Sequence, residues 1–163
     1  MRAVYRPQEE PTDERDCLAC DILAGRQESP GGAIYENDYW AVEHSVSPVL
    51  LAGFLIVKPK RHCEQIADLT LDEMEAFGQV LHDTTNALTR VLRPEKVYVC
   101  SFGEMGKHIH FYVIPRTSDM PASGREVLRL MFEGRWACSD EEAEEVAVRV
   151  KAEMEKVASR PTE

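Results

Sequence analysis

Long apolar runs and an excess of positive charge are both absent from this sequence. No run of about 18 apolar residues occurs in the 163-residue chain, so we expect no membrane-spanning helix. The 29 acidic residues outnumber the 19 basic ones, and the resulting formal net charge of −10 repels nucleic-acid backbones. We therefore expect neither a membrane nor a nucleic-acid polymer as a partner, whereas a small phosphate-bearing ligand in a local pocket is allowed.

Familiar phosphate-binding and hydrolase motifs are missing as well. The sequence contains no G-x-G-x-x-G fingerprint, no P-loop and no nucleophile elbow, and nothing in its pattern favours a doubly wound Rossmann sheet. Residues 1–14 are polar and acidic without an apolar segment, so we expect a disordered lead-in rather than a signal peptide. A cytoplasmic location is the resulting expectation.

Cysteine is scarce, and its odd count of five argues against a disulfide framework. Cys17 and Cys20 form a C-x-x-C pair, which in a reducing compartment indicates either half of a metal site or a redox motif. Zinc requires four nitrogen or sulfur ligands, and His62 and His108 complete such a set, with Cys63 as a rival. The alternative is that Cys17 and Cys20 are two thiols without a function. A redox role is disfavoured, because thioredoxin-type motifs lie between a strand and a helix, and this sequence lacks that context.

Hydrophobic periodicity predicts an α+β domain with a mostly antiparallel sheet and one long helix. The capping-box pattern Thr70–Glu73 begins that helix, which runs to about Leu92. Similar patterns at Ser123–Glu126 and Ser139–Glu142 predict two further helices, ending near residues 132 and 157. A short helix is expected over residues 16–24, and strands are expected over residues 33–36, 39–43, 53–58, 96–102 and 109–114.

The last of these strands carries two histidines and a tyrosine at alternate positions. Side chains alternate between the two faces of a strand, so His108, His110 and Tyr112 are predicted to share one face. Ile109 and Phe111 then share the other face and pack on the core. The polar row is either a chance feature of a solvent-facing strand or the centre of a site.

Together these motifs resemble the histidine triad (HIT) superfamily of nucleotidyl hydrolases and transferases. The resemblance implies an HIT-like nucleotide-binding domain over residues 15–118 and a homodimer. Residues 119–163 lie outside the shared core, and we expect them to form a helical extension that packs on the same domain. The matching pieces follow the family's order: Cys17-x-x-Cys20-x-Ile22, Tyr35–Asp38, Gly53 to His62, Leu69–Glu73, and His108-x-His110 ending at Pro115-Arg116.

The resemblance also implies a catalytic set of His110, Tyr112 and His108. His110 matches the nucleophile, which attacks the α-phosphorus of a nucleotide and forms a covalent nucleotidyl-histidine. The implied substrates are dinucleoside polyphosphates or nucleoside phosphoramidates, with Mg²⁺ accompanying a polyphosphate. Tyr112 stands where the family has its third histidine, and a phenol with a pKa of about 10 donates hydrogen bonds but is a poor acid–base group. A structural zinc is implied on Cys17, Cys20, His62 and His108.

Nucleotide contacts are where the sequence departs most from the family. The segment before the triad is short, and Ser101, Gly103 and Lys107 are its candidate phosphate contacts. Ser45 aligns with the family's ribose-binding acidic residue, and His44 lies beside it. Two functional hypotheses follow: an enzyme that uses a covalent histidine, or a zinc-stabilised nucleotide-binding module with weak or no turnover. A thiol redox protein is a third hypothesis.

Overall fold

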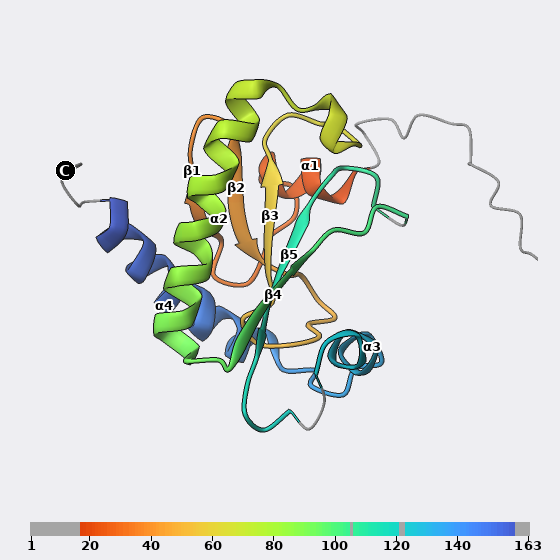
Figure 1. The fold of residues 1–163 in the computed structure, drawn as a ribbon, viewed down its shortest axis with the longest axis vertical. Coiled ribbons are helices and arrows are strands. Elements are labelled where there is room, and N and C mark those ends of the chain that lie inside the picture. Colours follow the sequence, from red (N-terminus) through yellow and green to blue (C-terminus); the bar gives the residue numbers. More distant parts are fainter. Residues whose placement is uncertain (1–16, 105, 121–122, 159–163) are drawn as a thin grey trace, which may run out of the picture.

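One antiparallel sheet in the order β1-β2-β3-β5-β4 organises the residues that the computed structural model describes, 17–104, 106–120 and 123–158 (Figure 1). Its strands are β1 (Ala33–Glu36), β2 (Trp40–His44), β3 (Leu55–Pro59), β4 (Lys96–Cys100) and β5 (Phe111–Arg116). The helices are α1 (Leu18–Leu23), the 3-10 helix η2 (Ile66–Asp68), α2 (Leu71–Leu92), α3 (Arg125–Phe132) and α4 (Asp140–Ala158). The α+β prediction with one long helix is confirmed, while the expected lead-in 1–14 lies outside the described residues.

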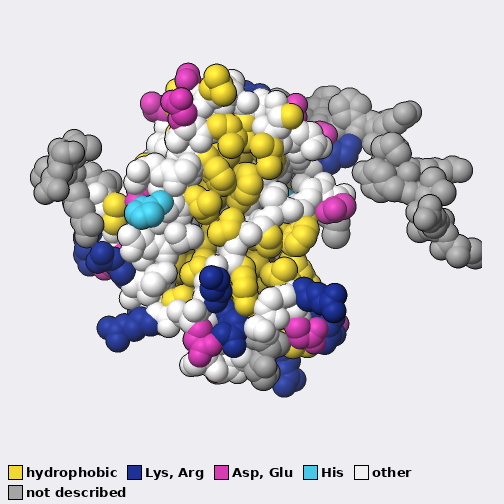
Figure 2. All heavy atoms as spheres, viewed as in Figure 1, with side chains coloured by type: hydrophobic (Ala, Val, Ile, Leu, Met, Phe, Trp, Pro, Cys, Tyr) yellow, Lys and Arg dark blue, Asp and Glu magenta, His cyan; other side chains and the backbone are white. Residues whose placement is uncertain are grey.

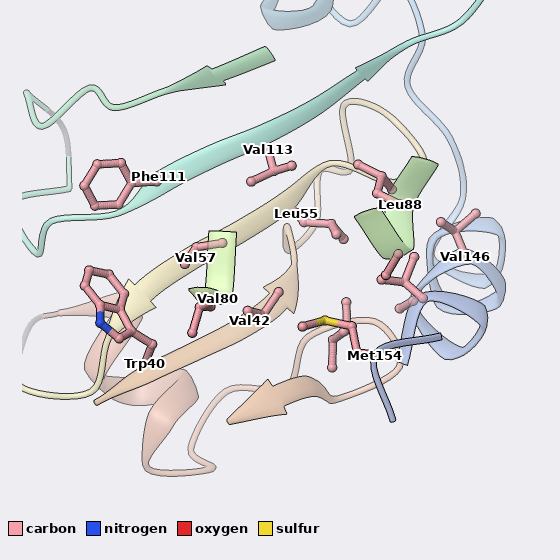
Figure 3. Packing of buried hydrophobic residues seen from close by; sticks show 14 of the residues in the cluster. Trp40, Val42, Leu55, Val57, Val80, Leu88, Phe111, Val113, Val146 and Met154 are labelled. Carbon is pink, nitrogen blue, oxygen red and sulfur yellow. The ribbon is translucent and has the colours of Figure 1, made fainter. Parts of the chain in front are cut away.

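Helices α2 and α4 cover one face of the sheet and bury its main core (Figures 1 and 3). Val42, Val57 and Val113 project from three neighbouring strands into this core, and Leu88 of α2 and Val150 of α4 meet them. A second apolar cluster, which includes Phe54, Ile114 and Val127, lies where α3 packs on the sheet. The residues that alternate with the main core on β2, β3 and β5 therefore face away from α2.

Helix starts follow the sequence predictions at α2 and α4 but not at α3. Thr70 and Glu73 form a reciprocal capping box at α2, and Ser139 and Glu142 form another at α4. The predicted box at Ser123–Glu126 is wrong, because α3 begins after Gly124 without a side-chain cap. Gly124 has a φ of 57°, a conformation that glycine adopts readily.

The histidine-bearing strand begins later than predicted. β5 starts at Phe111, so His108 and His110 precede the strand and only Tyr112 lies on it. The segment before β5 makes other bonds, because the Ile109 amide donates to the carbonyl of Cys63 at 2.8 Å. The expectation that all three side chains share a strand face is therefore corrected.

The expected strands at 39–43, 53–58 and 96–102 shift by one or two residues to become β2, β3 and β4. Edge strand β4 carries the exposed Val99, and exposed Phe102 follows it. Figure 2 shows hydrophobic side chains gathered along the middle of the face that Figure 1 presents. No helix among the described residues is both long and apolar enough to cross a membrane.

Candidate active site and metal centre

The four predicted zinc ligands lie together at the start of α1. Their ligand atoms are all within 4.8 Å of one another, although the residues come from three separate parts of the chain. Cys20 Sγ is 3.3 Å from Nδ1 of His62 and 3.5 Å from Nδ1 of His108, and Cys17 Sγ is 3.6 Å from the latter. Tetrahedral zinc places neighbouring sulfur and nitrogen ligands about 3.6 Å apart, so this set fits the ion.

His108 is oriented for such a role by its second ring nitrogen. Its Nε2–H donates to the carbonyl oxygen of Pro59 at 2.9 Å, which leaves the Nδ1 lone pair facing the thiols. Burial lowers the pKa of His108 to about 4, and the bond to Pro59 counters only part of this effect. The imidazole is therefore neutral near pH 7, the form that binds a metal.

The other cysteines do not join this cluster. Cys63 packs in the hydrophobic core, and burial raises the pKa of its thiol, so the rival ligand is set aside. Burial also raises the pKa of the thiols of Cys100 and Cys138. All five cysteines lie within the described residues, and none of them forms a disulfide there.

His110 is held in one tautomer by the backbone two residues before it. Its Nδ1–H donates to the carbonyl oxygen of His108 at 2.8 Å, so Nε2 carries the lone pair. The His110 carbonyl accepts a hydrogen bond from Ser101 Oγ at 2.7 Å, which anchors the same segment to the end of β4. A Cβ added at Gly106 would lie 3.6 Å from Cε1 of His110, so this loop passes close to the ring.

A cavity of about 430 Å³ opens beside His110, on the sheet face away from α2. Its apolar wall includes Leu18 and Ile22 of α1, Val46 and Leu50 after β2, and Phe132 of α3. Its polar residues are Glu43, Ser45, Lys58, Lys107, His108, His110 and Tyr112. The cavity thus combines apolar walls suited to a flat ring with the imidazole of His110 and two lysines.

Tyr112 lies next to His110 in the wall of this cavity. The two ring centroids are 4.8 Å apart in an edge-to-face arrangement, and the ring of Phe54 packs on Tyr112 at 5.0 Å. Burial raises the pKa of Tyr112 above its ordinary value of 10.0, so the phenol keeps its proton near neutrality. Tyr112 is therefore placed as a hydrogen-bond donor beside the histidine.

Five residues were predicted to bind nucleotide, and the structure brings two of them, Ser45 and Lys107, to the cavity. His44 is fully buried, with its Nδ1–H donating to the Ser45 carbonyl and its Nε2 accepting from the Gly53 amide. Ser101 is committed to the His110 carbonyl, and exposed Gly103 is not among the described residues that line the cavity.

Sequence reasoning missed a buried ion pair in the cavity wall. The ammonium of Lys58 on β3 contacts the carboxylate of Glu43 on β2, and both side chains are almost wholly buried. The sequence does contain a signal for this pair, because Glu43 and Lys58 place opposite charges in two otherwise apolar strands. An unpaired charge is strongly disfavoured in such a buried strand, so the two charges are expected to pair with each other.

Comparison with known proteins assigns the family. The HIT domain family matches residues 26–119, which is more than half of the chain. An uncharacterized HIT-like protein of Methanocaldococcus jannaschii is 27% identical over 104 residues, covering 61% of this chain and 78% of that protein.

Solved structures share the fold. A zinc-bound histidine triad family protein from Mycobacterium smegmatis has a TM-score of 0.69 at 18% identity, covering 90% of this chain and 99% of that one. A hypothetical histidine triad nucleotide-binding protein from Sulfolobus tokodaii also has a TM-score of 0.69 at 18% identity, covering 86% and 93% of the two chains. With the cysteine–histidine cluster at the family's positions and Tyr112 in place of the third triad histidine, this chain belongs to the HIT domain family.

Proposed function

We propose that this protein is a nucleotidyl hydrolase or transferase that acts on small nucleotides through a covalent nucleotidyl-histidine on His110. The observation that carries the proposal is the hydrogen bond from Nδ1–H of His110 to the His108 carbonyl. A neutral imidazole bonded in this way has its Nε2 lone pair available for attack, and His110 lines the cavity. The substrate classes are dinucleoside polyphosphates, with Mg²⁺ accompanying the polyphosphate, and nucleoside phosphoramidates.

The reaction has two displacements at one phosphorus atom. In the first, Nε2 of His110 bonds to the α-phosphorus while the bond from phosphorus to the leaving oxygen or nitrogen breaks, and its electron pair leaves with that group. Tyr112 O–H donates a hydrogen bond to the leaving atom, and Lys107 brings positive charge to the phosphate. In the second, water or an acceptor hydroxyl attacks phosphorus and loses a proton, and the P–N electron pair returns to Nε2.

Zinc is proposed as a structural ion on Cys17, Cys20, His62 and His108. Four protein ligands leave no open position, so the ion supplies rigidity rather than reaction chemistry. Those ligands join α1 to the segments before η2 and before β5. The segment before β5 also carries His110, so metal binding supports the position of the nucleophile.

The proposal is tested with a panel of diadenosine polyphosphates and an adenosine phosphoramidate, comparing the wild type with His110→Ala. We expect turnover in the wild type, a covalent nucleotidyl adduct detected by mass spectrometry of the quenched intact protein, and loss of both in the variant. Turnover that survives the substitution would exclude the covalent-histidine mechanism. Nucleotide binding without turnover or adduct in the wild type would instead favour the zinc-stabilised binding module.

Two further expectations, one from the family resemblance and one from the sequence itself, stay predictions. Homodimer formation is checked by sedimentation equilibrium of the full chain, in which a dimer has twice the mass of the 18.5 kDa protomer. The cytoplasmic location is checked by fractionating cells that produce the protein and probing each fraction with an antibody.

A further inference from the structure

The buried ion pair between Lys58 and Glu43 lies in the wall of the proposed nucleotide cavity. The Lys58 side chain is 1% exposed and the Glu43 side chain 6%, and Lys58 Nζ donates to Glu43 Oε1. A buried ion pair is often no more stabilising than apolar residues of the same volume, because both charges lose their hydration. Its presence in a ligand cavity therefore indicates a role in recognition.

Strand register fixes where the carboxylate lies relative to the proposed nucleophile. Glu43 on β2 is opposite Ile56 on β3, which is opposite Tyr112 on β5, so Glu43 and Tyr112 are two strand spacings apart. This separation is about 10 Å. Lys58 follows Val57, which is opposite Phe111, the first residue of β5 after His110. Because His110 and Glu43 line the same cavity, a nucleotide whose phosphate is at His110 can reach Glu43 with its base.

The surroundings of Glu43 suit a flat heteroaromatic ring. Leu18, Ile22 and Val46 line this cavity together with Glu43, and the same four residues line an adjoining cavity of about 810 Å³. The carboxylate of Glu43 therefore lies among the apolar side chains of Leu18, Ile22 and Val46, and the ring of a nucleotide base packs favourably on such side chains. Acceptors on the ring edge are repelled there by the carboxylate, and N–H donors are attracted.

One carboxylate oxygen of Glu43 is available to a ligand. Oε1 accepts from Lys58, whereas Oε2 has no hydrogen-bond partner within the part of the chain that the structure describes. Burial raises the pKa of Glu43, and the ammonium of Lys58 opposes this effect through its charge and its hydrogen bond to Oε1. The carboxylate that is paired with this ammonium only accepts hydrogen bonds. The group that completes this site must therefore donate a hydrogen bond.

We propose that Glu43, paired with Lys58, recognises the base of the bound nucleotide by accepting a hydrogen bond from an exocyclic amino group. The cavity then selects a 6-aminopurine over the purine that lacks this amino group, because the latter presents only ring-nitrogen acceptors to the carboxylate. This inference rests on the proposed function, because it requires the phosphate end of the nucleotide to lie at His110. A hydrogen bond to a charged group predicts at least about tenfold discrimination.

The test is calorimetric binding of AMP and of purine riboside 5′-monophosphate, which lacks the amino group, to the full-length protein, and it requires no turnover. We expect AMP to bind the wild type at least about tenfold more tightly than the purine riboside 5′-monophosphate. Glu43→Gln should bring the two affinities within about threefold, because an amide presents either a donor or an acceptor. Since this variant leaves Lys58 buried without its counter-charge, the double variant Glu43→Gln/Lys58→Met removes both charges together, and it should also lose the discrimination.

Glu145→Gln is the matched control, because Glu145 is exposed on α4 and paired with Arg149. It should keep the wild-type ratio. Equal binding of AMP and purine riboside 5′-monophosphate by the wild type, an unchanged ratio in both Glu43 variants, or no binding of either nucleotide would overturn the inference. Failure of the proposed function gives a different result: the AMP preference persists in the wild type and in His110→Ala, but no nucleotidyl adduct forms.

Discussion

The carbonyl oxygen of His108 accepts the Nδ1–H of His110 at 2.8 Å, while the His108 ring turns its own Nδ1 toward the thiols of Cys17 and Cys20. His108 therefore belongs to the metal cluster through its side chain and to the proposed nucleophile through its backbone. Fixing the His108 ring also restrains the carbonyl that orients His110. Loss of metal should consequently disturb the nucleophile as well as the stability of the fold.

We expect one zinc ion per chain, and we expect Cys20→Ser to lose it. A metal present at a thousandfold excess over its dissociation constant stabilises the native state by about 4 kcal/mol, so chelation should lower the free energy of unfolding by about that amount. Elemental analysis and urea unfolding with and without chelator measure the two effects. Cys138→Ser is the control, because Cys138 lies outside the cluster. Identical unfolding curves with and without chelator would argue against the site.

Tyr112→Phe should lower turnover by about tenfold to hundredfold with little change in KM, since a hydrogen bond to a developing charge is lost. The aromatic ring that packs on Phe54 is kept, so urea unfolding should be nearly unchanged. Because burial raises the pKa of Tyr112 above 10.0, the phenol stays protonated at pH 7 to 9. The wild-type to variant ratio of kcat should therefore be constant across that range. A kcat equal to that of the wild type would remove Tyr112 from the reaction.

Glu73 should make stability depend on pH in the acid range. Its hydrogen bonds with Arg61 are the main cause that lowers the pKa of this carboxyl from its ordinary value of 4.5 to about 2. A depressed folded-state pKa stabilises the native state above pH 4.5, and this stabilisation is lost as pH falls toward 2. Arg61 is half-exposed, so solvent screening limits the effect to about 1–2 kcal/mol.

Urea unfolding of the wild type and Glu73→Gln at pH 6 and pH 3 measures this contribution. The variant should be less stable than the wild type at pH 6, and the difference should shrink at pH 3. A difference that is the same at both pH values would assign the effect to the capping box of α2 rather than to the charge of Glu73.

Gly53→Ala should destabilise the fold by about 1–3 kcal/mol, the range for a strained backbone position. Gly53 has a φ of +84°, and an added Cβ would lie 2.5 Å from Leu92 Cδ1 and 3.3 Å from Pro115 Cγ. Urea unfolding measures the change. Gly78→Ala in α2 is the matched control, since nothing lies within 4 Å of its added Cβ and alanine favours a helix. A neutral result at Gly53 would show that the turn before β3 adapts.

Local sequence signals accounted for much of the fold. The capping box at Thr70 and the apolar stripe after it located α2, because both depend on residues close in the chain. The start of β5 was misplaced because it is set by partners far away in sequence. His108 bonds to Pro59 and Ile109 bonds to Cys63, so the chain pairs with β3 only from Phe111 onward.

The metal-binding part of the candidate site was predictable from the sequence, because few residue types can bind the metal. Zinc accepts few residue types, so Cys17, Cys20, His62 and His108 were identified together and the structure clusters them. His44 and Ser101 were less predictable, because their polar atoms bond to the fold itself. Glu43 and Lys58 were missed since each charge in isolation suggests exposure, and only their pairing explains their burial.

The residues of the metal cluster are remote from one another along the chain, since Cys17 and His108 are 91 positions apart. Contacts of such high sequence separation form late in folding, after the entropy of closing a long loop has been overcome. In an unfolded or newly made chain the His108 carbonyl is therefore not held against His110, and the imidazole is not fixed in the tautomer that has its lone pair on Nε2. The reactivity that we propose for His110 is in this way reserved for chains that have completed their long-range closure.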